Sequence, residues 1–299
     1  MHRHPHAVPW RAYLLLAAST SLVGSYVGLS KLLVAAFPVF LLAGLRFGFA
    51  AVLMLPWLKK PAGEAPLDAR SRGLLFLESF LGNFLFSICM LFGLRQSSAV
   101  VAGVIMAGIP AAVALLSRAV LGERLNRRTL AGIACAVAGI ALVATSRQGG
   151  AETTPLGALL LVAAVFCEAC YVVIGKKLTA GLGPKRISAL INLWGLVLVS
   201  PLAAWQALSF DFASPRALDW ALLAYYAATA SVVTVWLWMA GLRGLPAAQA
   251  GVFMVFLPIS TALIGLALGE SLSAAQALAY GLALSGVLLA TWPARTRAG

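Results

Sequence analysis

Three ionisable side chains interrupt long apolar runs of this 299-residue sequence, and they are its strongest candidates for chemistry. Arg46 and Glu168 lie near the middle of their runs, whereas Glu78 lies ~9 Å, about one and a half helical turns, from the end of its run. A charge inside a membrane-spanning helix costs at least about 2.5–3.5 kcal/mol, so such residues indicate function. Arg46 and Glu168 could form a structural charge pair or bind the two ends of a zwitterion, or Glu168 could exchange a proton during the working cycle.

Two stripes of small, polar and aromatic residues accompany these charges, 148 residues apart. The first consists of Glu78, Ser79, Gly82, Asn83, Phe86 and Met90, at helical i, i+4 spacing or on the adjacent row. The second consists of Tyr226, Ala230, Ser231, Thr234 and Trp238. Because a polar group facing lipid costs several kcal/mol, both stripes are expected to face one interior cavity. Such a wall suits an amphipathic organic molecule better than a bare ion, although the rings could instead simply pack helix against helix.

Two prolines fall near the middle of apolar runs. Pro110 and Pro258 predict bent helices that free the backbone carbonyls of Met106 and Met254 one turn earlier. Unpaired backbone at membrane depth is tolerated when it lines a wet cavity, so these four residues are expected near the substrate; bends made only for packing are the alternative. Tyr171, close to Glu168, completes the expected set of binding residues.

The composition requires a membrane as solvent. Hydrophobic residues make up 62% of the chain and charged residues 10%, against about 45–50% and about 25% in a soluble domain. Apolar runs of about 20 residues, enough to cross about 30 Å of hydrocarbon, recur along the whole chain. The ten runs are 11–30, 37–57, 73–94, 98–121, 128–146, 155–175, 187–206, 217–240, 247–268 and 274–292. They leave almost no chain for a soluble domain, and the first run is expected to be a retained helix rather than a cleaved signal.

The net charge of +13 is explained by orientation rather than by nucleic acid. With the N-terminus inside the cell, 17 of the 22 Lys and Arg residues fall in cytoplasmic loops and tails, four fall outside, and Arg46 falls within a run. Cytoplasmic loops of membrane proteins collect positive charge. Both termini are therefore predicted to be cytoplasmic, and the expected partners are the lipid bilayer and a small-molecule substrate, not nucleic acid.

An internal repeat relates the two halves of the chain. Residues 93–110, GLRQSSAVVAGVIMAGIP, match residues 241–258, GLRGLPAAQAGVFMVFLP, at about half of the positions without a gap. Runs one to five thus recur as runs six to ten, and because five is odd the halves enter the membrane from opposite sides. The predicted organisation is a tail at 1–10, one five-helix repeat at 11–146, a linker at 147–154, a second repeat at 155–293 and a tail at 294–299. Inverted repeats of this kind are typical of secondary transporters with a midplane site.

The ordered motifs of the chain resemble those of the EamA-type branch of the drug/metabolite transporter superfamily. They are Val23-Gly24-Ser25-Tyr26 with Lys31, Leu42-Ala43-Gly44-Leu45-Arg46-Phe47, Pro110, Pro258, and the turns Leu121-Gly122-Glu123 and Leu268-Gly269-Glu270. Val23 departs from the family, which usually has Trp there. The resemblance implies an all-α polytopic membrane protein of ten transmembrane helices in two inverted five-helix repeats. It also implies export of small metabolites across the bacterial inner membrane, chiefly amino acids including aromatic ones, by alternating access.

Three other functions remain open on the sequence alone. A phosphorylated-sugar or nucleotide-sugar exchanger would ordinarily need more deep cations than Arg46. A membrane-embedded enzyme could use Glu78 or Glu168 as acid and base, and a structural subunit would not transport by itself. No enzymatic activity and no cofactor are expected.

The remaining reactive residues are expected to be structural. The histidines lie in the N-terminal tail and the four cysteines inside apolar runs, so no metal site is expected. Gly44 and Gly48 permit close helix contact within a monomer or in a homodimer. Glu123 and Glu270 are interpreted as anchors at helix ends, not as substrate ligands.

Overall fold

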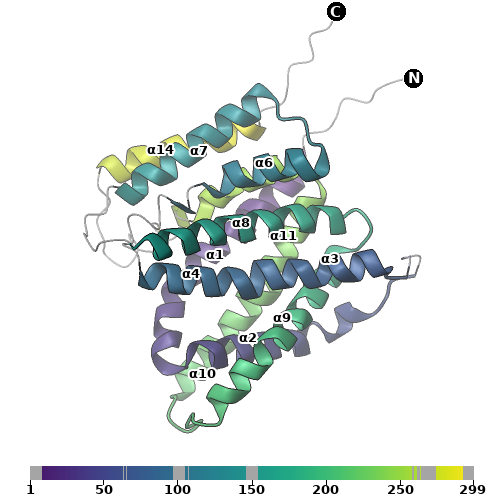
Figure 1. Cartoon of the computed structure of the whole chain (residues 1–299), viewed down its shortest axis with the longest axis vertical. Coiled ribbons are helices and arrows are strands. Elements are labelled where there is room, and N and C mark those ends of the chain that lie inside the picture. Colours follow the sequence, from purple (N-terminus) through teal and green to yellow (C-terminus); the bar gives the residue numbers. More distant parts are fainter. Residues whose placement is uncertain are drawn as a thin grey trace, which may run out of the picture.

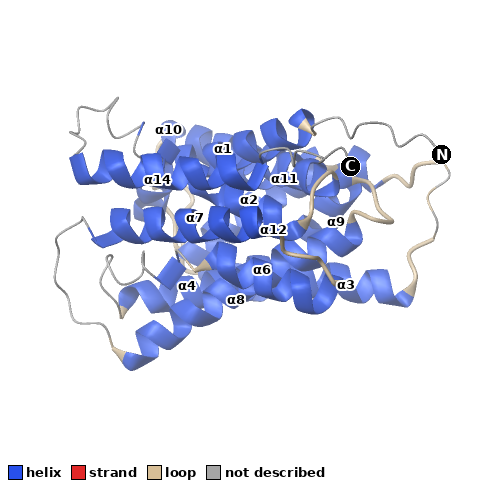
Figure 2. Ribbon diagram, turned by 90° about the horizontal axis from the view of Figure 1, so that it is seen from above, coloured by secondary structure: helices blue, strands red, loops and turns tan. Residues whose placement is uncertain are grey.

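The computed structural model describes residues 9–62, 64, 66–96, 105–106, 108–145, 154–257, 259–260, 263 and 274–291, and within these ranges every regular element is a helix (Figures 1 and 2). The α-helices of the first half are α1 (Trp10–Ala36), α2 (Val39–Leu53), α3 (Ala69–Ser79), α4 (Phe86–Arg95), α6 (Ile109–Leu121) and α7 (Arg127–Thr145). Those of the second half are α8 (Pro155–Leu178), α9 (Pro184–Ala207), α10 (Ala217–Tyr226), α11 (Thr234–Arg243), α12 (Ala247–Gly251) and α14 (Ala274–Thr291). Two 3₁₀ segments, η1 (Leu55–Leu58) and η4 (Val252–Val255), and two π-helical segments, η2 (Phe80–Leu85) and η3 (Ala227–Val233), complete the description.

The helices form a bundle in which α3, α4 and α8 lie nearly parallel to one another, whereas α9, α10 and α11 run at an angle to them (Figures 1 and 2). At one end of the bundle α7 packs along α14, and at the other end α2 packs along α9 (Figure 1). Between these pairs, α1 packs against α11, and α8 packs against both α4 and α6. Each of the pairs α7–α14, α2–α9 and α1–α11 joins one half of the chain to the other.

The internal repeat is visible in the element bounds. The continuous helix α3–η2–α4 runs from Ala69 to Arg95, and α10–η3–α11 runs from Ala217 to Arg243, an offset of 148 residues at both ends. Each of these helices contains a π-helical segment in its middle, at Phe80–Leu85 and at Ala227–Val233. Because π-helical turns are rare and frequently occur at functional sites, their recurrence marks this pair of helices for attention.

Four helices are long and apolar enough to cross a membrane among the residues that the structure describes. They are Ala69–Met90, Pro155–Leu178, Pro184–Ala207 and Ala217–Arg243. Shorter apolar helices lie at Val39–Leu53, Ile109–Leu121 and Tyr280–Ala290. Each of the seven overlaps one predicted run, and the three shorter helices lie wholly within theirs. The count of ten spans stays a prediction.

The structure corrects the prediction of a bend at Pro110. Helix α6 begins at Ile109, so Pro110 stands in the first turn. The N–H groups of a first turn have no acceptor within the helix, so a proline there removes no intrahelical hydrogen bond. The Gly108 N–H donates to the Ile105 carbonyl at 2.9 Å, which closes a turn before the helix. The fourth run is therefore divided at Pro110 rather than bent there. Met254 lies in the 3₁₀ segment η4, and Pro258 lies outside the described residues.

Glu123 joins the two halves at the end of α6. Gly122 ends this helix with a φ of 67°, a left-handed conformation that favours glycine. The carboxylate of the next residue, Glu123, accepts hydrogen bonds from the N–H groups of Ala247 at 2.7 Å and Ala248 at 3.1 Å, at the start of α12. The interpretation of Glu123 as an anchor is confirmed, whereas Glu270 lies outside the described residues.

Replacing Glu123 with alanine is expected to destabilise the protein by about 1.5–3 kcal/mol, because it removes two charge-assisted bonds and leaves buried N–H groups without acceptors. Thermal unfolding of the purified protein in detergent measures the effect. Glu123→Gln keeps one acceptor oxygen and is expected to lose less. Arg124→Ala, at the exposed neighbouring position, is the control, and an equal loss in this variant would contradict the assignment.

Candidate functional site

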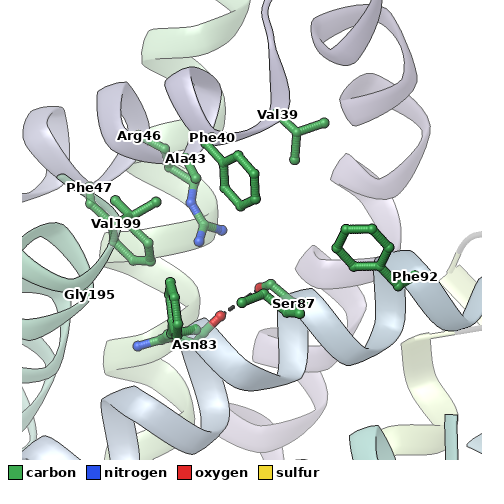
Figure 3. A pocket seen from close by; sticks show the side chains of 12 residues that line it. Val39, Phe40, Ala43, Arg46, Phe47, Asn83, Ser87, Phe92, Gly195 and Val199 are labelled. Atoms are coloured by element: carbon green, nitrogen blue, oxygen red, sulfur yellow. Dashed lines mark hydrogen bonds between the residues drawn. The ribbon is translucent and has the colours of Figure 1, made fainter. Parts of the chain in front are cut away.

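A cavity opens between α2, the η2–α4 helix and α9 (Figure 3). It encloses ≈ 500 Å³ of empty space, including its open mouth. Its lining residues are Val39, Phe40, Ala43, Arg46, Phe47, Asn83, Phe84, Ser87, Ile88, Phe92, Gly195 and Val199. The wall is thus apolar and rich in aromatic rings, with one cation and two neutral polar side chains. Cavities that bind small organic molecules commonly have this composition.

Arg46 brings a positive charge to this cavity. In Figure 3 its guanidinium group points from α2 into the space lined by Asn83 and Ser87. The guanidinium carbon lies 4.4 Å from the ring centroid of Phe47 and 5.6 Å from that of Tyr226, both within cation–π range. The buried Nε atom has no hydrogen-bond partner. Aromatic rings therefore hold the charged side chain at the cavity, and its Nε–H group is left without an acceptor.

Hydrogen bonds to α9 position the polar residues of both π-helical segments. Ser79 directly precedes η2, and its hydroxyl donates to the Ile191 carbonyl of α9 at 2.8 Å. The amide of Asn83, within η2, donates to the Ser79 hydroxyl at 3.3 Å. The Asn192 amide donates to the Ser231 carbonyl in η3 at 3.0 Å. One stretch of α9 thus fixes the same part of both repeats and sets the position of Asn83 at the cavity.

The first predicted stripe does not face this cavity as a unit. Asn83 lines it, whereas a Cβ added at Gly82 would overlap the ring of Tyr171 on α8. The carboxyl group of Glu78 also faces α8, because a Cβ at Gly175 would lie 2.7 Å from Glu78 Oε1. This part of the stripe is a helix-packing surface, which was the alternative interpretation. Phe86 and Met90 are half-buried and are not among the lining residues.

The second stripe is mostly buried between helices. Ser231, Thr234 and Trp238 are each less than 9% exposed, and the Thr234 hydroxyl donates to the Thr229 carbonyl at 2.7 Å. The Ser19 hydroxyl of α1 donates to the Thr234 carbonyl at 2.9 Å. Tyr226 is the member of this stripe that reaches the cavity region, through its ring beside Arg46.

The remaining predicted residues lie elsewhere. Glu168 is half-buried on α8, which packs against α3, α4 and α6, whereas Arg46 lies on α2. The two side chains form no ion pair; the ion pairs within the described ranges are Arg186–Glu64 and Arg216–Asp219. The predicted structural pair is therefore absent from this conformation. Met106 and Met254 are half-buried and Pro110 is buried, and the cavity lining includes none of the three.

Most residues of the cavity wall carry no distinguishing signal in the sequence. Phe40, Phe47, Phe84 and Phe92 are ordinary residues of apolar runs, and a phenylalanine that faces lipid looks the same in sequence as one that faces a cavity. Asn192 was also missed, although an amide inside the seventh apolar run is a usable signal because it requires a buried partner.

Comparison with known proteins identifies the family. The EamA-like transporter family matches the chain twice, over residues 10–145 and 155–292. The chain belongs to the EamA-like transporter family. It is therefore a membrane transporter, and the two matches coincide with the two halves related by the internal repeat.

Several relatives cover nearly the whole chain. The uncharacterized transporter YetK of Bacillus subtilis is 34% identical over 283 residues, which are 93% of this chain and 86% of the relative. A probable amino-acid metabolite efflux pump of Escherichia coli is 28% identical over 165 residues, 55% of this chain and 53% of the pump. A protein of known crystal structure matches with a TM-score of 0.74 at 20% identity, over 93% of this chain and 95% of that one, and so has the same fold.

Proposed function

We propose that this EamA-like protein is a secondary transporter that exports small amphipathic metabolites, chiefly amino acids including aromatic ones, by alternating access across the bacterial inner membrane. The proposal is carried by the cavity between α2, α4 and α9. There a guanidinium group stands among aromatic rings, and this combination suits a molecule with one anionic group and an apolar part. The relative named as a probable amino-acid metabolite efflux pump supports the same class of solute.

The substrate carboxylate is proposed to bind Arg46, with Asn83 and Ser87 offering further hydrogen bonds and the phenylalanine rings contacting the side chain. A single cation balances one carboxylate, whereas a doubly charged phosphate would ordinarily need several cations. This argument favours amino acids over phosphorylated sugars.

The membrane arrangement belongs to the same proposal. Ten spans in two inverted repeats, with both termini in the cytoplasm, agree with the charge distribution of the loops. In alternating access the two halves would move against each other, and the contacts α1–α11 and α2–α9 would be those that rearrange.

Counterflow in proteoliposomes tests the proposed function. Vesicles that contain the purified protein are preloaded with unlabelled tryptophan, and uptake of labelled tryptophan, phenylalanine, glucose 6-phosphate or a cationic drug is measured against protein-free vesicles. We expect uptake of the two amino acids. A different result would support the phosphorylated-sugar exchanger: glucose 6-phosphate shows counterflow in vesicles loaded with sugar phosphate, and the amino acids show no counterflow. Chemical conversion of a solute without its movement would support an enzyme.

A further inference from the structure

Glu78 is a completely buried carboxyl group without a partner. Its side chain is 0% exposed, and neither carboxyl oxygen has a hydrogen-bond donor. It lies on α3, one residue before Ser79 and five before Asn83, on the helix that continues through η2 to the cavity. The group takes no part in binding at the cavity, so its burial needs another explanation.

The surroundings of Glu78 are apolar. A Cβ at Gly175 of α8 would lie 2.7 Å from Oε1, and the same Cβ would lie 3.3 Å from Leu242 Cδ2 and 3.3 Å from Met239 Cε on α11. The carboxyl group therefore occupies a notch that exists because residue 175 is glycine. We call the contact among α3, α8 and α11 at Gly175 the Glu78 seam.

Among the described residues, none of the charged side chains on the neighbouring elements forms an ion pair with Glu78. They are Arg70 and Arg72 on α3, Glu168, Lys176 and Lys177 on α8, Lys185 and Arg186 on α9, and Arg243 on α11. The Lys176 ammonium donates to the carbonyls of Leu242 at 3.0 Å and Arg243 at 3.1 Å. The Arg186 guanidinium pairs with Glu64 at 3.1 Å, and the Lys185 ammonium lies over the rings of Trp57 and Trp236.

An ionised carboxylate in such a place would cost far more than a neutral carboxylic acid. The geometry thus points to a group that binds a proton when the seam closes. We propose that Glu78 is the proton-binding site of the transport cycle, protonated while the Glu78 seam is closed and deprotonated when α3 parts from α8 and α11. This inference rests on the proposed function, because it assigns the coupling ion of that transporter.

The proton step is a simple acid dissociation. When water enters the open seam, the carboxyl O–H bond breaks, the electron pair stays on the carboxylate and the proton passes to water; closure requires the reverse step. Since Glu78 and Asn83 lie on one continuous helix, movement of α3 at the seam also moves a wall of the cavity. Protonation and access to the substrate are thereby linked through one element.

Glu78→Gln separates coupling from transport. The amide has the same size but cannot release a proton, so tryptophan counterflow, which needs no net proton movement, is expected to remain. Uphill tryptophan movement driven by an imposed pH gradient is expected to fall at least tenfold. Gradient-driven movement that is undiminished in Glu78→Gln would overturn the inference. Absence of counterflow in the wild-type protein would instead overturn the proposed function.

A control variant and a second measurement guard against misfolding. Asp68→Asn removes a carboxylate at the N-cap of the same helix, where asparagine also caps well, and is expected to keep gradient-driven transport. Infrared difference spectra of the wild-type protein between acidic and alkaline pH are expected to contain, among the signals of the other carboxyl groups, a protonated carboxyl band that is absent from Glu78→Gln. Its presence at equal strength in the variant would assign the proton to another residue and overturn the inference.

Discussion

Replacing Arg46 with glutamine is expected to lower the rate of tryptophan counterflow at subsaturating concentration by about 30-fold. The variant loses the cation that the cavity presents, and a charge-assisted hydrogen bond of about 2 kcal/mol corresponds to that factor. Glutamine also lacks the cation–π contacts with Phe47 and Tyr226, so the remaining side chain would be held less firmly. Initial uptake rates in proteoliposomes over a range of tryptophan concentrations measure the loss.

Two further variants show whether the loss comes from Arg46 itself. Arg46→Lys keeps the charge but not the planar fork of donors, so an intermediate rate is expected. Arg118→Gln removes an exposed arginine of α6 that does not line the cavity, and it is expected to transport like the wild type. If Arg46→Gln is monodisperse and transports at the wild-type rate, the cavity does not bind the substrate through Arg46.

Replacing Gly286 with alanine is expected to destabilise the contact between α7 and α14 by about 1–3 kcal/mol. A Cβ at Gly286 would lie 2.6 Å from the Gly132 carbonyl oxygen, and a Cβ at Gly132 would lie 2.6 Å from the Gly286 carbonyl oxygen. The clash is with backbone, which cannot rotate away as a side chain can, so the helices must separate. Thermal unfolding in detergent measures the change.

The same helix provides a control. Gly281 of α14 has nothing within 4 Å of its added Cβ, so Gly281→Ala is expected to be neutral or slightly stabilising through helix propensity. Gly132→Ala combined with Gly286→Ala is expected to cost less than the sum of the single changes, because one separation of the helices relieves both clashes. Additive losses, or an equal loss at Gly281, would contradict this account of the packing.

The sequence predicts the organisation of the fold better than the details of the site. Hydrophobic runs and the offset of 148 residues indicate which helices correspond, and the bounds of α3–η2–α4 and α10–η3–α11 agree with this. Arg46 could be singled out because a charge in an apolar run is conspicuous. These predictions depend on composition and periodicity, which are local properties of the chain.

The partner of each helix face could not be predicted in the same way. Spacing places Glu78 and Gly82 on one face but does not say whether that face meets a cavity or Tyr171. The π-helical segment Phe80–Leu85, which contains Gly82, also changes the number of residues per turn, so an i, i+4 series from Glu78 to Met90 is displaced as it crosses this segment. At Pro110 the same limitation applies, because a proline begins a helix as readily as it bends one.

The two π-helical segments have a bearing on the history of the chain. Both helices that contain them span the same number of residues, and in both the wide turn occupies corresponding positions. Inheritance of the wide turn from one common ancestor explains this more simply than two independent insertions at the same place. The wide turn would then be older than the duplication that produced the two halves of the chain, and the single ancestral unit would already have contained it.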